Sequence, residues 1–141
     1  MAGATLRKIY CWEMRIEDLT VYLASTRKGA AGIGLTLERR SDCIDFFKGI
    51  FPNNTLLKDY RVNLPLVRKV KALSCNDAAN RPVDLDIECT PFQWLVFKAI
   101  AEIPFGETRS YGEVASMIGR PNNARAVGQA LGKNPLPLIF P

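Results

Sequence analysis

The sequence of 141 residues contains no histidine and no two cysteines separated by two residues. Without histidine, neither a Ser–His nor a Cys–His catalytic pair can be built from these residues. The same absences argue against a structural zinc site, which needs closely spaced cysteines or histidines. We therefore expect no metal and no cofactor, and we predict that the cysteines are reduced, buried side chains. They are Cys11, Cys43, Cys75 and Cys89.

A long apolar run is also missing. A membrane helix needs about 18 or more consecutive apolar residues, and no segment of the sequence approaches that length. Residues 1–8 lack the apolar core of a signal peptide. With 48% hydrophobic and 23% charged residues, the composition is that of a globular protein. We therefore expect a cytoplasmic protein with no membrane partner.

Basic residues are in modest excess. The formal net charge is +5 and the isoelectric point is about 9.2. The positive charge is spread over both halves of the chain instead of forming a basic tail. A polyanionic partner is compatible with this balance but is not required by it. Any surface for nucleic acid would be a local patch.

The fold class predicted is α+β, and residues 1–86 are predicted to form a small mixed α/β subdomain. Uneven alternation over residues 6–24 indicates two short strands on either side of a turn at residues 17–18. Residues 25–32 have the composition of a turn-rich connector, and residues 33–37 read as a third strand.

Helices and linkers complete this first part. Residues 41–42 resemble a helix cap before a helix over residues 43–51, and a loop is expected to begin at Asn53. Apolar spacing predicts a second helix over residues 64–74. Residues 75–82 have the composition of a linker, and residues 83–87 alternate like a short strand.

Residues 87–141 are predicted to be almost purely helical. Thr90 and Pro91 form a strong helix start. Ser110 and Glu113 have the spacing of a capping box. The apolar stripes expected on the first two helices comprise Phe92, Leu95, Val96, Ala99, Ile100 and Ile103, and then Val114, Ala115, Met117 and Ile118.

The two last helices suggest a helix-turn-helix. A turn over residues 119–123 joins them, and the second helix is expected over residues 124–133. This helix carries only two long polar side chains, Arg125 and Gln129, among alanines and glycines. Its small residues permit close packing against a neighbouring helix, or close approach to a minor groove with Arg125 as a wedge. Arg125 could instead be a surface residue paired with an acid such as Glu113.

Four segments of this half then resemble the O6-alkylguanine-DNA alkyltransferase family. They read TPFQWLVF, IPFGETRSYGEVA, ARAVG and NPLPLIFP, and they begin at Thr90, Ile103, Ala124 and Asn134. The order and spacing are those of the family, and the segments cover residues 90–141 almost continuously. The first 80 residues resemble the family only in layout.

The resemblance implies a monomeric DNA-repair protein with a winged-helix-like domain over residues 87–141. Such a protein binds double-stranded DNA carrying O6-alkylguanine through the minor groove, flips the damaged nucleotide out of the stack and moves the alkyl group onto its own cysteine. It acts once and then stays alkylated. Its work would place it at the nucleoid or in the nucleus.

The same resemblance implies a role for individual residues. Arg125 corresponds to the finger that fills the gap left by the flipped base. Tyr111 crowds the phosphate of the flipped nucleotide and donates towards the base, and Asn134 links the recognition helix to the active-site segment. Pro137 is part of the alkyl pocket. The remaining DNA-contact positions are Ser110, Ala124, Ala126 and Gly128.

One departure from the family pattern concerns the acceptor. In the family, the position equivalent to Pro141 is followed by the reactive cysteine, then His and Arg, with a Glu later. The four cysteines of this sequence match other positions, and Cys89 stands where the family usually has Gly. We therefore expect these 141 residues to be a fragment that cannot accept an alkyl group. Two alternatives stay open: a non-catalytic alkyltransferase-like damage-binding protein, and a helix-turn-helix regulator.

Overall fold

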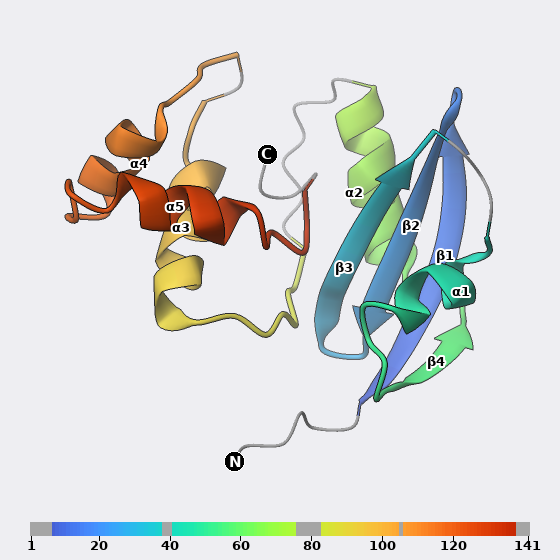
Figure 1. Cartoon of the computed structure of the whole chain (residues 1–141). Coiled ribbons are helices and arrows are strands. Elements are labelled where there is room, and N and C mark those ends of the chain that lie inside the picture. Colours follow the sequence, from blue (N-terminus) through green and yellow to red (C-terminus); the bar gives the residue numbers. More distant parts are fainter. Residues whose placement is uncertain (1–6, 38–40, 76–82, 105, 138–141) are drawn as a thin grey trace. The chain divides into compact units, whose positions relative to one another are not determined.

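A computed structural model describes residues 7–37, 41–75, 83–104 and 106–137 of the chain. The chain divides into two compact units, Met1–Ile87 and Glu88–Pro141, and each is considered by itself. Among the described residues, four strands form one sheet and five helices accompany them (Figure 1). The mixed α/β class expected from the sequence is confirmed.

The first unit is built on the sheet, whose strand order is β3-β2-β1-β4. β1 (Lys8–Ile16), β2 (Leu19–Thr26) and β3 (Gly29–Thr36) form an antiparallel meander. The short β4 (Thr55–Lys58) pairs with β1 in parallel. The predicted turn between the first two strands is confirmed, with Glu17 in the left-handed region at φ 54°.

Two helices pack on the sheet, α1 (Cys43–Lys48) and α2 (Leu64–Ser74). Figure 1 shows α1 in front of the sheet and α2 behind it. The Asp42 side chain caps α1 by accepting a hydrogen bond from Asp45 N at 2.9 Å. An apolar cluster joins α1 to the sheet and consists of Ile9, Cys11, Tyr22, Ala24, Cys43 and Phe47.

Several predictions for this unit need correction. The connector predicted at residues 25–32 is wrong, because β2 continues to Thr26 and β3 already begins at Gly29. The first helix ends at Lys48, three residues before the predicted end. β4 was not predicted, because its four residues gain their partner from β1, far away in the sequence. Of the linker predicted at residues 75–82, Cys75 is the C-cap of α2 and residues 76–82 lie outside the described residues.

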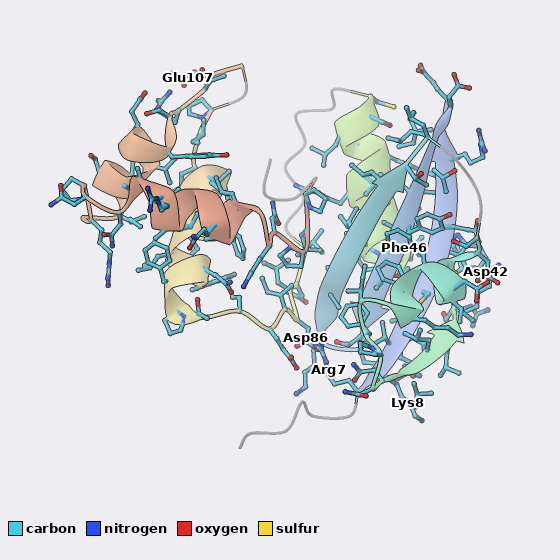
Figure 2. All side chains as sticks on the ribbon, in the orientation of Figure 1. Arg7, Lys8, Asp42, Phe46, Asp86 and Glu107 are labelled. Carbon is cyan, nitrogen blue, oxygen red and sulfur yellow. The ribbon has the colours of Figure 1, made fainter. Side chains whose placement is uncertain are left out.

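The predicted strand over residues 83–87 is reduced to a single bridge between Leu85 and Ala30. Ala30 exchanges two backbone hydrogen bonds of 2.8 Å with Asp84 and Asp86. The Asp86 carboxylate also accepts from Thr26 Oγ1 and pairs with Arg7 Nη1 at 3.2 Å (Figure 2). This segment is therefore fastened to the edge of the sheet by side-chain contacts as well as by backbone hydrogen bonds.

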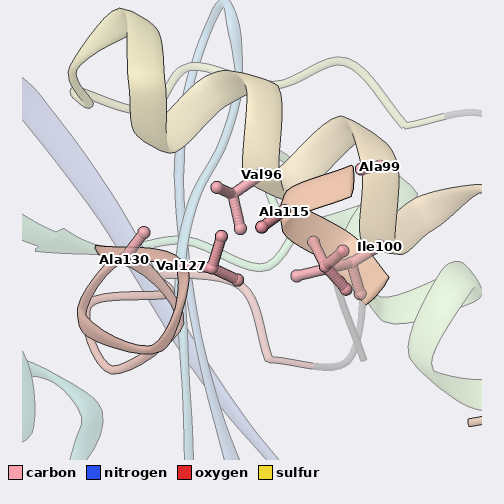
Figure 3. Packing of buried hydrophobic residues seen from close by; sticks show 7 residues of the cluster. Val96, Ala99, Ile100, Ala115, Val127 and Ala130 are labelled. Atoms are coloured by element: carbon pink, nitrogen blue, oxygen red, sulfur yellow. The ribbon is translucent and has the colours of Figure 1, made fainter. Parts of the chain in front are cut away.

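The second unit is a group of three helices, α3 (Pro91–Ala101), α4 (Tyr111–Met117) and α5 (Ala124–Leu131). Thr90 caps α3 in a capping box with Gln93, which confirms the predicted start. The core lies where the three helices meet (Figure 3). It consists of Val96, Ala99, Ile100, Val114, Ala115, Val127 and Ala130.

The apolar stripes predicted for α3 and α4 contain the core residues of these two helices, Val96, Ala99, Ile100, Val114 and Ala115, but the stripes are too wide. Leu95 and Met117 are 40% and 45% exposed, so neither belongs to the core. Phe97, which the stripe omitted, is fully buried.

None of the helices in the described ranges is both long and apolar enough to cross a bilayer.

Candidate nucleic-acid interface

The candidate interface is the pair of helices α4 and α5 with the turn between them. Ser110 and Glu113 form the predicted capping box at the start of α4, with Glu113 N donating to Ser110 Oγ at 3.1 Å. Gly119 ends the helix at φ 75°, a conformation that glycine adopts without strain. The Arg120 amide then bonds Ala115 O at 2.8 Å, which turns the chain towards α5.

The two sides of α5 differ sharply in character. Val127 and Ala130 are buried in the core of the unit. Arg125 and Gln129 stand on exposed positions one helical turn apart, while Ala124 and Ala126 are half-buried. The helix therefore presents one long cation, one long amide and otherwise small side chains.

Arg125 has no hydrogen bond or ion pair to any other residue in the described ranges. The alternative pairing with Glu113 is not found there, because Glu113 is engaged elsewhere. Its carboxylate accepts from Ser110 N at 3.3 Å and lies 4.0 Å from Arg109 Nε. The guanidinium of Arg125 is thus available to a ligand.

The start of α5 is open to anions. Asn123 precedes the helix but makes no side-chain cap, and no acidic residue lies in the first turn. The first amide groups of a helix have no partner within the helix and attract negative charge. An anion near Ala124 would meet both these amides and the nearby guanidinium of Arg125.

Tyr111 begins α4 and is 54% exposed. Its ring lies against Gly128 of α5, and a Cβ built on that glycine would be only 2.9 Å from Tyr111 Cε2. The ring also borders a hollow of about 350 Å³. Ile100, Ile103, Pro104, Val114 and Leu131 supply the apolar lining, and Gly106, Glu107, Thr108 and Arg109 supply the rest.

Arg109 holds the loop before α4 in place, a role that the sequence analysis missed. Its guanidinium donates to Thr108 O at 2.9 Å and lies 3.4 Å from the Glu107 carboxylate, which Figure 2 marks. With Glu113 on the other side, Arg109 joins this loop to α4. Arg109 and Glu113 are four residues apart, but Arg109 lies before the first residue of α4, so helical spacing alone did not predict this contact.

Asn134 shapes the chain beyond α5. Its backbone N–H donates to Leu131 O at 3.1 Å, and its side-chain Oδ1 accepts from Leu136 N at 2.9 Å. This turn carries Leu136 into a fully buried position, and Pro137 is half-buried beside it. Among the described residues, the lining of the hollow includes Tyr111 but not Asn134, Pro137 or Arg125. Residues 138–141 lie outside the described ranges.

Three of the four cysteines, Cys11, Cys43 and Cys89, are poor nucleophiles where the structure places them. Burial raises the pKa of the Cys11 thiol to about 12, helped by the neighbouring Cys43 and Asp42. Burial also raises the pKa of Cys43 and of the half-buried Cys89. Cys75 is exposed, which corrects the prediction that all four are buried. Within the described residues, no group of three His, Cys, Asp or Glu side chains could hold a metal ion.

The second unit matches a known protein family. Residues 91–141 match the family described as 6-O-methylguanine DNA methyltransferase, DNA binding domain. The inducible methylated-DNA–protein-cysteine methyltransferase of Bacillus subtilis is 30% identical over 133 residues, or 94% of this chain and 74% of that protein. The corresponding protein of Mycobacterium bovis is 48% identical over 75 residues, 53% of this chain and 46% of its own length.

Solved structures show the same relationship in three dimensions. The crystal structure of Mycobacterium tuberculosis O6-methylguanine methyltransferase has a TM-score of 0.75 at 31% identity, covering 94% of this chain and 75% of the other. That of Mycobacterium tuberculosis OGT in complex with DNA has a TM-score of 0.70 at 32% identity, covering 95% and 74%.

Proposed function

Because the chain belongs to the O6-methylguanine-DNA methyltransferase family, we propose that it binds double-stranded DNA and repairs O6-alkylguanine by direct transfer of the alkyl group. In this proposal α4 and α5 are a helix-turn-helix in a winged-helix-like domain spanning residues 87–141. The domain works as a monomer and needs no cofactor. The observation that carries the proposal is Arg125, exposed and without a partner in the described residues, on a helix of small side chains.

The exposed side of α5 would enter the minor groove. Ala124 and Ala126 add little bulk, so the helix backbone can come close to the sugars. The uncapped first turn of α5 would receive a phosphate. Ser110 Oγ accepts a hydrogen bond from Glu113 N, and its own proton is then free to donate to a second phosphate.

Arg125 would replace the damaged nucleotide within the duplex. Extrusion of a base costs a few kcal/mol, which contacts with the opened duplex must offset. A guanidinium in the vacated space can donate hydrogen bonds to the orphaned partner base. Tyr111, at the start of α4, would crowd the phosphate of the extruded nucleotide and keep it turned outwards.

The extruded base would be received beside Tyr111. The hollow of about 350 Å³ falls within the range of about 300–1,000 Å³ typical of ligand sites. Pro137 is not among the described residues that line this hollow, and the family resemblance assigns it to the pocket around the alkyl group. The hydrogen bond from Leu136 N to Asn134 Oδ1 would set the direction of the chain between the end of α5 and Pro137.

The chemistry is a displacement at the alkyl carbon. A cysteine thiolate forms the new C–S bond while the bond from the carbon to guanine O6 breaks. The departing guanine takes a proton, which we assign to the Tyr111 hydroxyl, itself reprotonated from solvent. The acceptor is the cysteine that the family resemblance puts directly after Pro141. The four cysteines of these 141 residues are not acceptors, so the segment alone would be inactive.

A mass spectrum after incubation with duplex DNA containing O6-methylguanine tests this proposal. The full-length protein should gain one methyl group on a cysteine after Pro141, and a protein ending at Pro141 should gain none. Selective binding of the lesion without any gain in mass would favour the non-catalytic damage-binding alternative. Equal affinity for damaged and undamaged duplexes would favour the helix-turn-helix regulator.

A further inference from the structure

Gly128 sits at the closest approach between α5 and the ring of Tyr111. A Cβ on Gly128 would lie 2.9 Å from Tyr111 Cε2, 3.1 Å from Cδ2 and 3.6 Å from Cζ. Real Cβ atoms essentially never approach another heavy atom closer than 3.0 Å. The bare Cα of Gly128 is therefore what allows the ring to lie where it does.

The backbone gives no other reason for glycine at this position. Gly128 lies inside α5, and the glycines with positive φ are Gly29, Gly106 and Gly119. In a helix interior, glycine is less favourable than alanine by about 1 kcal/mol. Helix stability alone would thus favour alanine, and the contact with Tyr111 is what opposes it.

The direction in which a Cβ on Gly128 would point distinguishes a contact with DNA from a contact with Tyr111. The family resemblance puts this residue against the DNA groove together with Ala124 and Ala126. In the structure, the Cα–Cβ direction of Gly128 leads to Tyr111 of α4 instead. A methyl group added here would meet the tyrosine ring first.

We infer that Gly128 is a positioning residue for Tyr111, an inference that rests on the proposed function. The glycine lets the ring settle against α5, which fixes the ring beside the hollow that Tyr111 lines. A half-exposed ring can move away from an added methyl group without unfolding the unit. The cost of Gly128→Ala then falls on alkyl transfer, because a displacement of about 1 Å can slow a reaction on the order of 100-fold.

The test compares Gly128→Ala with Gly132→Ala in the full-length protein. Gly132 is the matched control, since its Cβ would meet only Gln129 O at 3.5 Å and Gly128 O at 3.7 Å. We expect Gly128→Ala to slow transfer from O6-methylguanine DNA by on the order of 10- to 100-fold. Affinity for undamaged duplex should stay unchanged, and Gly132→Ala should alter neither quantity.

Double variants identify the partner through which Gly128 acts. In a Tyr111→Ala background the ring is gone, so adding Gly128→Ala should slow transfer no further. In a Tyr111→Phe background the ring remains, so the full effect should persist. If Gly128→Ala weakens binding of undamaged duplex, or slows transfer as much in the Tyr111→Ala background, Gly128 touches DNA directly and the inference is wrong.

The NMR signals of the Tyr111 ring test the positioning role of Gly128 without relying on the repair reaction. Gly128→Ala should shift the ring carbon signals of Tyr111, whereas Gly132→Ala should leave them in place. Unshifted signals in Gly128→Ala would refute the positioning role even if repair proceeds. A wild-type protein that transfers no methyl group would refute the proposed function instead.

Discussion

The ring of Phe46 lies flat on the ring of Tyr22, with 4.3 Å between centroids and 9° between planes. The stack occupies the space above Gly34, the residue of β3 that pairs with Tyr22. A Cβ on Gly34 would be 2.1 Å from Phe46 Cζ. Because Gly34 has no side chain, β3 leaves room for the contact between Phe46 of α1 and Tyr22 of β2.

Gly34→Ala should therefore destabilise the first unit. The added methyl group must push Phe46 off Tyr22, and overpacking of this kind costs about 1–3 kcal/mol. Urea unfolding followed by tyrosine and tryptophan fluorescence measures the change. Gly49→Ala is the matched control, because nothing lies within 4 Å of its Cβ position. Equal stability of Gly34→Ala and the wild-type protein would show that the stack is not tightly packed.

The thiols should differ in reactivity. Cys11 and Cys43 are buried with raised pKa values, so iodoacetamide should modify them only after unfolding. The exposed Cys75 should react in the native protein. Peptide mass spectrometry after timed labelling near neutral pH checks this order. Native labelling of Cys11 as fast as that of Cys75 would contradict the burial described for β1.

Alkaline pH should weaken the first unit through Cys11. Its pKa is raised from 9.0 to about 12 in the folded chain, so the unfolded state releases this proton at lower pH. Below about pH 9 the thiol is protonated in both states and its effect on stability is constant. Above that, the free energy of unfolding should fall as pH rises towards about 12. Urea midpoints measured on either side of about pH 9 test the slope, which Cys11→Ala should reduce. An identical slope in that variant would exclude Cys11 as its source.

Ser110→Ala separates a cap from a DNA contact. Loss of the bond from Glu113 N to Ser110 Oγ should cost about 1 kcal/mol of stability. If Ser110 also binds a phosphate, affinity for undamaged duplex should fall as well. Thr90→Ala is the control, because it removes the same kind of cap from α3. A Ser110→Ala protein that loses stability but keeps full DNA affinity would reduce Ser110 to a cap alone.

Local signals in the sequence predicted the helices well. Thr90, Ser110 and Asp42 each announce a helix through a side chain that reaches only three residues ahead. β4 gave no such signal, since Thr55–Lys58 is a strand only because β1 lies beside it. The contact between Gly128 and Tyr111 was equally hidden, because it depends on how α4 and α5 cross. That Arg125 is exposed, and unpaired within the described part of the chain, likewise required coordinates.

Arg125→Ala should weaken binding of the lesion by about 1–3 kcal/mol while leaving the stability of the unit nearly unchanged, because the side chain is exposed. Competition binding with damaged and undamaged duplexes measures the effect. Lys98→Ala removes the same charge from an exposed position on α3 and is the matched control. An equal loss in both variants would mean that Arg125 acts only through net charge.

The fluorescence of 2-aminopurine placed beside O6-methylguanine in a duplex tests most directly whether α5 extrudes the damaged base. This base analogue brightens when its neighbour leaves the stack. We predict a rise on adding the wild-type protein, a much smaller rise with Arg125→Ala and a full rise with Lys98→Ala. No rise with the wild-type protein, or the same rise with Arg125→Ala, would contradict it.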